Sequence, residues 1–170
     1  MFRALTIRIV DFYLKANDIF YEATKGYLDT VLIGNDFGAQ TGLIVSPENV
    51  REFSMPGAKL FVDQAHSYGL KVIHHSCGSI FEIIPDLIEI GVDAIHPIQA
   101  LAANMEAVRL KENFGNKISF VGGIDVQHLL VNGSPEEIRN KVKELKQLFL
   151  TGLVFSPSHE AVLPDIPPSN

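Results

Sequence analysis

The sequence has little cysteine, few basic residues and no long apolar run. Each of these shortages excludes some classes of protein. One cysteine among 170 residues excludes an internal disulfide and is typical of a reducing compartment, so we expect a cytoplasmic location. A net charge of −6 is opposite to the basic surface that nucleic-acid-binding proteins use. No apolar run approaches the ~20 residues of a membrane helix. Charges such as Arg8 and Asp11 interrupt the N-terminal segment, so we expect no signal peptide.

Short apolar runs alternate with helical patterns along the whole chain. Strands are predicted at residues 30–34, 71–75, 92–95, 118–121 and 153–155. Helices are predicted from about 9 to 25, from 46 to 68 with a break or kink at Pro56, and at 81–91, 104–113 and 134–148. The last begins with Ser134-Pro135-Glu136-Glu137, a capping box with proline in the first turn. The alternation predicts an α/β fold with a parallel sheet, and residues 1–170 as a single domain without a linker.

The stretch from Lys71 to Ser79 carries the strongest chemical signal. His75 and Cys77 are two residues apart, so on an extended backbone both project to the same face, and His74 projects to the other. Neutral imidazole and thiolate are ligands that Zn²⁺ prefers. The alternative is that Cys77 is a small buried apolar residue and that the histidines are ordinary core or surface residues.

Polar side chains follow all five predicted strands. In a parallel α/β protein, ligands bind at the carboxyl ends of the strands, where the strand-to-helix loops converge. The residues at these ends are Asn35 and Asp36, His75 and Cys77, His96 and Gln99, Asp125, and finally Ser156, Ser158, His159 and Glu160. Taken singly, Asp36 has an alternative role as a turn residue, Asp125 as a helix N-cap and Gln99 as plain surface.

His75, Cys77 and His159 together form the predicted metal site. Two ligands come from one strand end and the third from a later one. Three protein ligands leave a fourth position open, which is the arrangement of catalytic zinc sites. Such a zinc ion either holds a substrate thiol as a thiolate or activates water.

A series of short motifs also occurs in a familiar order. The motifs are Asn35-Asp36-Phe37-Gly38-Ala39-Gln40, Ser46-Pro47-Glu48, His75-Ser76-Cys77-Gly78, Ile83-Ile84-Pro85-Asp86-Leu87, His96-Pro97-Ile98-Gln99, Gly122-Gly123-Ile124-Asp125, Ser156-Pro157-Ser158-His159 and Pro164-Asp165-Ile166-Pro167-Pro168. The series resembles the uroporphyrinogen decarboxylase superfamily, which includes the cobalamin-dependent methyltransferases. The resemblance covers nearly the whole chain from about residue 8.

The resemblance implies a (β/α)₈ TIM barrel, which is about twice as long as this chain. The chain then corresponds to the C-terminal part of the barrel, with about five βα units. Five parallel strands would leave open edges. We therefore expect a fragment, or a chain whose gap is covered by a homo-oligomer or by a complementing N-terminal half. On strand count alone, a five-stranded doubly wound sheet is the alternative fold.

The resemblance also suggests a function. The methyltransferase branch has His-x-Cys and a later cysteine that bind zinc, and this chain matches the first element but has Ser158-His159 at the second. Our first hypothesis is a zinc-dependent methyltransferase-like enzyme that transfers a methyl group to a thiol or a corrinoid and works with a corrinoid carried by a partner protein. The small-molecule substrate would contact Asp36, Gln40, Gln99 and Asp125, with Asp36 and Asp125 as candidate catalytic carboxylates.

Two other functions are also compatible with the sequence. One is uroporphyrinogen decarboxylase itself, a metal-free enzyme of porphyrin biosynthesis. Its catalytic aspartate lies in the N-terminal half of that family's barrel. The other is a catalytically silent half-barrel that acts as a structural or binding partner. Zinc at His75 favours the methyltransferase, and its absence leaves the two rivals.

Overall fold

The computed structural model describes residues 2–159, 161 and 163–170, so Glu160 lies outside the described part. The helices are α1 (Phe2–Ala23), α2 (Pro47–Asn49), α3 (Met55–Ser67), α4 (Ile84–Glu89), α5 (Ala107–Phe114), α6 (Leu129–Asn132) and α7 (Pro135–Leu148), with a π-helical turn η1 (Val50–Ser54) and a 3₁₀ turn η2 (Phe81–Ile83). The strands are β1 (Thr30–Gly34), β2 (Gly38–Ala39), β3 (Gly42–Leu43), β4 (Lys71–His75), β5 (Ala94–Ile98), β6 (Ser119–Ile124) and β7 (Leu153–Pro157).

A single parallel sheet organises the chain. Its strand order is β1-β4-β5-β6-β7, and every neighbouring pair is parallel. Each of the five predicted strands corresponds to one strand of this sheet. The order along the sheet follows the order along the chain, as successive right-handed βα units produce. The predicted α/β class is therefore confirmed.

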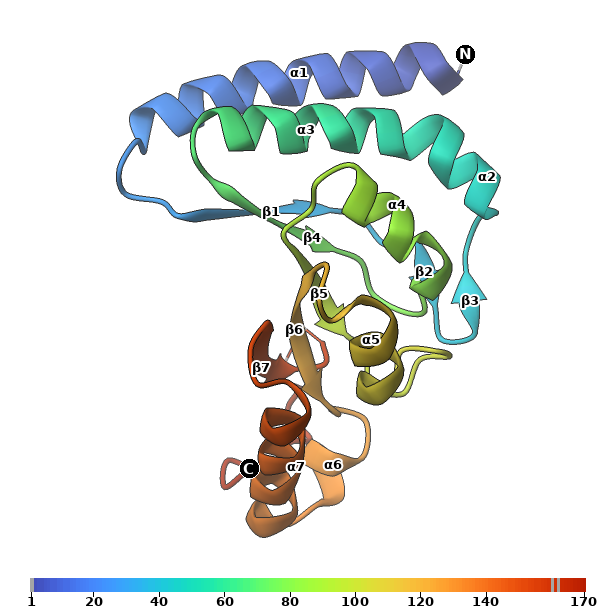
Figure 1. Ribbon diagram of the computed structural model, residues 1–170, viewed down its shortest axis with the longest axis vertical. Coiled ribbons are helices and arrows are strands. Elements are labelled where there is room, and N and C mark those ends of the chain that lie inside the picture. Colours follow the sequence, from blue (N-terminus) through green and yellow to red (C-terminus); the bar gives the residue numbers. More distant parts are fainter. Residues whose placement is uncertain (1, 160, 162) are drawn as a thin grey trace.

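The two faces of the sheet differ in burial. One face carries Val72, His74, Ile95 and Phe120, each at most 1% exposed, and packs against the helices (Figure 1). The opposite face is open at both outer strands, where Leu32 and Val154 are 58% and 60% exposed. The core therefore lies between the sheet and its helices, and the second face is not covered by the described residues.

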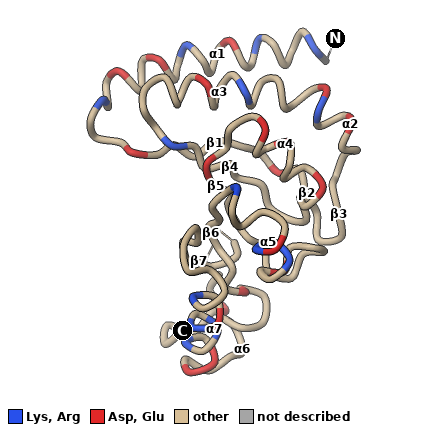
Figure 2. The backbone as a smooth tube through the Cα atoms, in the orientation of Figure 1, with Lys and Arg blue, Asp and Glu red and all other residues tan. Residues whose placement is uncertain are grey.

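Helix α1 packs along α3 (Figure 1), and several of its apolar side chains are exposed. Leu5, Ile9, Phe12 and Ile19 are between 47% and 75% exposed. Acidic and basic residues are interspersed along α1 and α7 (Figure 2). Among the described residues, no helix is both long and apolar enough to span a bilayer.

The structure departs from the sequence prediction at several boundaries. Helix α1 begins at Phe2 rather than near residue 9. Pro56 lies in the first turn of α3, where a missing N–H is tolerated, and η1 precedes it in place of the expected break. The segment from 35 to 40, predicted as a loop, contains the short strand β2, which pairs with β3 in a hairpin. The capping box at Ser134 is confirmed, with the Glu137 N–H donating to Ser134 Oγ.

Candidate functional site

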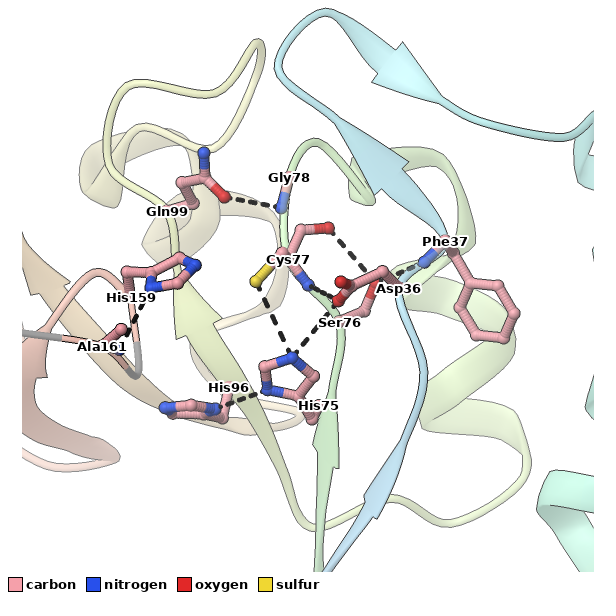
Figure 3. Close-up of polar contacts among 10 residues, drawn as sticks. All are labelled: Asp36, Phe37, His75, Ser76, Cys77, Gly78, His96, Gln99, His159 and Ala161. Carbon is pink, nitrogen blue, oxygen red and sulfur yellow. Dashed lines mark hydrogen bonds and ion pairs between the residues drawn. The ribbon is translucent and has the colours of Figure 1, made fainter. Parts of the chain in front are cut away.

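The candidate site lies where β1 and β4 end (Figure 3). Gly34 and His75, the last residues of the two strands, are register partners, so the chain leaves both strands at one edge of the sheet. Asp36 follows β1 by two residues, and Cys77 follows β4 by two. The alternation along β4 puts His75 on the opposite face of the sheet from His74, as the sequence spacing predicted.

Asp36, His75 and Cys77 converge within a very small volume. One potential ligand atom from each residue lies within 4.8 Å of the other two. His75 Nε2 is 3.2 Å from Asp36 Oδ1 and 3.7 Å from Cys77 Sγ. The His75 side chain is 14% exposed, whereas that of Asp36 is 54% exposed. One side of the group is therefore enclosed and the other is open to incoming molecules.

The carboxylate of Asp36 is held in place by the loop that carries the thiol. Asp36 Oδ1 accepts the Cys77 backbone N–H at 2.8 Å. This hydrogen bond is the main cause of a lowered pKa of Asp36; burial opposes it, and the nearby His75 lowers the pKa further. Ser76 supports the same contact between loops, because its Oγ accepts the Phe37 N–H at 2.9 Å. The Asp36 carboxylate is thus ionised at neutral pH, and its oxygens are potential metal ligands.

His74 lies on the opposite face of β4 from His75. It is 1% exposed, and its ring stacks on Phe37 with the centroids 5.7 Å apart. Burial lowers the pKa of His74 from 6.5 to about 4, and His75 contributes in the same direction. His74 is therefore a neutral core residue outside the site, in agreement with the prediction.

The predicted substrate residues Gln99 and Gln40 connect the loops beside Cys77. Gln99 Oε1 accepts the Gly78 N–H at 2.8 Å, and Gln99 Nε2 donates to Gln40 Oε1 at 2.9 Å. Gln40 Nε2 in turn donates to the Leu101 carbonyl at 2.6 Å. These contacts place both amides next to the group and use them to hold its loops together.

Asp125 occupies the position of a helix cap. Its carboxylate accepts the backbone N–H groups of Gln127, His128 and Leu129 at 2.8–2.9 Å, immediately before α6. It also lines a small hollow together with Gln99 and His159. The structure therefore brings these three predicted residues around one hollow, with both oxygens of Asp125 engaged by the backbone.

His159 stands apart from the compact group of potential ligands. Its Nδ1 accepts the Ala161 N–H at 3.1 Å, and its ring is not one of the three whose donor atoms cluster within 4.8 Å (Figure 3). Asp36 is the third residue of that group. The sequence signal for Asp36 was its position at a strand end, which predicted a substrate contact or a catalytic carboxylate and not a ligand.

The sequence prediction also left His96 out of the site. His75 and His96 are register partners on β4 and β5, and their Nδ1 atoms are 3.0 Å apart. Because β5 was expected to end at Ile95, His96 was placed in the following loop. The feature that identifies it is the register of β5 on β4, which sets His96 directly beside His75.

The three clustered donors fit a zinc ion. Imidazole nitrogen, thiolate sulfur and carboxylate oxygen are all zinc ligands, with bonds of about 2.0–2.3 Å. In a tetrahedral site such bonds place the ligand atoms about 3.3–3.8 Å from one another. The separations of 3.2 and 3.7 Å around His75 Nε2 are close to this range. Three protein donors leave a fourth position for a substrate atom.

Comparison with known proteins gives a family match, a curated relative and a solved structure of similar fold. The family model described as Uroporphyrinogen decarboxylase (URO-D) matches residues 21–170. A curated relative, the methylated-thiol–coenzyme M methyltransferase of Methanosarcina mazei, is 27% identical over 104 residues, which are 59% of this chain and 25% of the relative. A solved structure, a methyltransferase from Methanosarcina mazei, superposes with a TM-score of 0.63 at 20% identity.

The superposition covers 96% of this chain and 49% of the solved one. The chain thus spans about half of that structure and a quarter of the curated relative. At this identity the structural likeness establishes the fold. The predicted partial TIM-barrel architecture is confirmed.

Proposed function

This chain belongs to the uroporphyrinogen decarboxylase family, and from this membership and the site geometry we propose that it is part of a zinc-dependent methyltransferase with a thiol as methyl acceptor. The observation that carries the proposal is the convergence of Asp36, His75 and Cys77 donor atoms within 4.8 Å. The proposed ligands are His75 Nε2, Cys77 Sγ and an oxygen of Asp36. The earlier assignment of His159 as third ligand stays a prediction, to be decided against Asp36.

Zinc in this site would hold an incoming thiol as its thiolate, the form that is nucleophilic toward a methyl group. The residues of the chain supply the rest. The Cys77 N–H positions the Asp36 carboxylate and lowers its pKa, and Gln99 fixes the loop through Gly78. The exposed side of Asp36 leaves the thiol an approach from solvent.

The substrate class is inferred from the curated relative. Its name says that it acts on a methylated thiol and coenzyme M. We propose the same chemical class here, a small thiol as acceptor, and a corrinoid on a partner protein as methyl carrier. The predicted contacts of Gln40, Gln99 and Asp125 with this substrate, and a catalytic role for Asp36 or Asp125, remain predictions.

We further propose that residues 1–170 form one partial-barrel domain whose open face is covered by additional barrel strands. Exposed apolar side chains on β1 and β7, Leu32 and Val154, support this proposal. A closed barrel has eight strands and the described part of the chain supplies five, so three more complete it. A second copy of the chain would bring the total to ten strands, which is two more than the barrel needs. Light scattering that finds a stable monomer or a homodimer of the isolated chain would contradict a three-stranded complement.

X-ray absorption at the zinc edge tests the thiol-acceptor function directly. The chain contains one cysteine, so a site with one zinc per chain has one protein sulfur ligand. A saturating small thiol such as 2-mercaptoethanol should raise the sulfur count from one to two. The matched alcohol, ethylene glycol, should leave it at one. A count that stays at one with the thiol contradicts the thiol-acceptor proposal.

The metal-free decarboxylase remains the second candidate because of the family match over residues 21–170. It predicts a folded chain without zinc and binding of a polycarboxylate in place of a thiol. Metal content separates the two candidates before any activity assay is needed.

A further inference from the structure

His75 and His96 form a pair of imidazoles on adjacent strands. Their rings are tilted by 38° with centroids 5.2 Å apart, and the two Nδ1 atoms are 3.0 Å apart (Figure 3). The backbone locks the strands together at this point, because the Ser76 N–H donates to the His96 carbonyl at 2.8 Å. This backbone contact does not depend on the His96 side chain.

The short separation between the Nδ1 atoms fixes where protons can reside. A neutral imidazole carries one N–H, and one of its nitrogens donates while the other accepts. Only one proton fits between the two Nδ1 atoms. If this proton is bound to His75, then His75 Nε2 is unprotonated and its lone pair faces Asp36 and Cys77. If it belongs to His96, then His75 Nε2 carries a proton and donates it to Asp36 Oδ1, 3.2 Å away.

We infer that His96 is a positioning residue that holds the ring of His75 and pairs with its Nδ1 in both tautomers. This inference rests on the proposed zinc site, in which His75 Nε2 is a ligand atom. A ligating histidine usually donates its other N–H to an acceptor that orients the ring. His96 supplies that acceptor, and it also supplies a donor when His75 Nε2–H is directed at Asp36. An aspartate in its place would only accept.

Three substitutions at position 96 separate these roles. His96→Leu removes both donor and acceptor, His96→Asp provides only an acceptor, and His96→Asn retains both. His128→Leu is the matched control, because His128 is an exposed histidine before α6. The Ser76–His96 backbone hydrogen bond remains available in every variant, so circular dichroism should show the same fold.

The first readout is the tautomer of His75 in the metal-free chain. Long-range ¹H–¹⁵N spectra of the ring nitrogens distinguish Nδ1–H from Nε2–H, and His75→Gln identifies the signals. His96→Asp should shift His75 to the Nδ1–H form, and His96→Leu should shift it to the Nε2–H form that donates to Asp36. His128→Leu should leave the spectrum unchanged.

The second readout is zinc affinity, measured by competition with a chelating dye. Loss of a residue that orients a ligand typically weakens metal binding by about 10–100-fold, and we expect this loss for His96→Leu. His96→Asn should restore most of the affinity. A His75 tautomer and a zinc affinity that are both unchanged in His96→Leu would overturn the inference, as would His96→Asn behaving like His96→Leu. A wild-type chain that binds no zinc overturns the proposed function, while the tautomer series still decides the role of His96.

Discussion

Gly78 lies against Gly38 so closely that a side chain on either residue would overlap the other loop. A Cβ atom built on Gly78 would be 2.4 Å from the carbonyl carbon of Gly38, and one built on Gly38 would be 2.7 Å from the Cys77 carbonyl oxygen. The Ser79 N–H also donates to the Ala39 carbonyl at 2.8 Å. The loops after β1 and β4 are therefore in backbone contact, and this contact brings Asp36 to Cys77.

Gly78→Ala should destabilise the chain and separate these loops. Gly78 has a φ of 77°, which disfavours alanine by about 1–3 kcal/mol, and the overlap with Gly38 adds to this cost. Gly69→Ala is the matched control, because Gly69 has a φ of 76° and no described atom lies within 4 Å of its Cβ position. Urea denaturation should show a larger loss of unfolding free energy for Gly78→Ala. Equal losses would mean that the loops do not depend on this contact.

Removal of the cap of α7 should cost about 1 kcal/mol of unfolding free energy in Ser134→Ala. Ser134 Oγ accepts the Glu137 N–H, and Glu137 Oε2 accepts the Ser134 N–H at 2.7 Å. Ser134→Thr retains the hydroxyl and should lose less. Chemical denaturation of the three proteins measures the difference, and a Ser134→Ala variant as stable as the wild type would contradict the structural role of the box.

His74→Phe should reduce the loss of stability in acid. His74 has a pKa of about 4 in the folded chain against 6.5 ordinarily, so between these values the unfolded chain binds a proton that the folded chain does not. Stability therefore falls as pH falls through this window, by about 3 kcal/mol in total. The phenyl ring can keep the stacking on Phe37 without this titration.

Urea denaturation at a series of pH values between 7 and 4 tests the His74 prediction. The other titrating groups are common to the wild type and the variant, so the difference between their two curves isolates His74. At pH 7 the variant should be no less stable, because the buried His74 Nδ1 has no hydrogen-bond partner among the residues that the structure describes. Parallel curves for the two proteins would contradict the neutral, buried state of His74.

The sheet could be predicted from the sequence because each strand is a local signal. The runs 30–34 and 71–75 are apolar or alternating and end at glycine or at a polar loop, and the structure places β1 and β4 at the same residues. The prediction for β5 was less accurate, because the strand was expected at 92–95 and spans Ala94–Ile98. In the structure the register shifts between Ile95 and Ile98, which accommodates Pro97 and extends the strand past His96.

The full set of site residues could not be predicted from spacing along the sequence, because tertiary contacts bring some of them together. The His75–Cys77 pair follows from alternation along one strand. Asp36 joins this pair through the Cys77 N–H and the close approach of Gly38 and Gly78, which link loops about 40 residues apart. His159 resembled a ligand by residue type and strand position, but its ring lies outside the compact group.

The ligand assignment leads to opposite expectations for two variants. If Asp36 is the third ligand, Asp36→Asn should weaken zinc binding by about 10-fold or more, and His159→Ala should change it little. Asparagine keeps the size of Asp36 and the oxygen that accepts the Cys77 N–H, so the loop should remain in place. Competition with a chelating dye measures both affinities, and a larger effect of His159→Ala would return the third position to His159.

The zinc content of the purified chain tests the central claim most directly. Atomic absorption of the wild type, of His75→Ala and of Cys77→Ser should be compared after dialysis against buffer with trace zinc, with circular dichroism to confirm folding. We predict about one zinc per wild-type chain and its loss in both variants. A folded wild-type chain that retains no zinc would contradict the proposed site and leave His75 and Cys77 as structural residues.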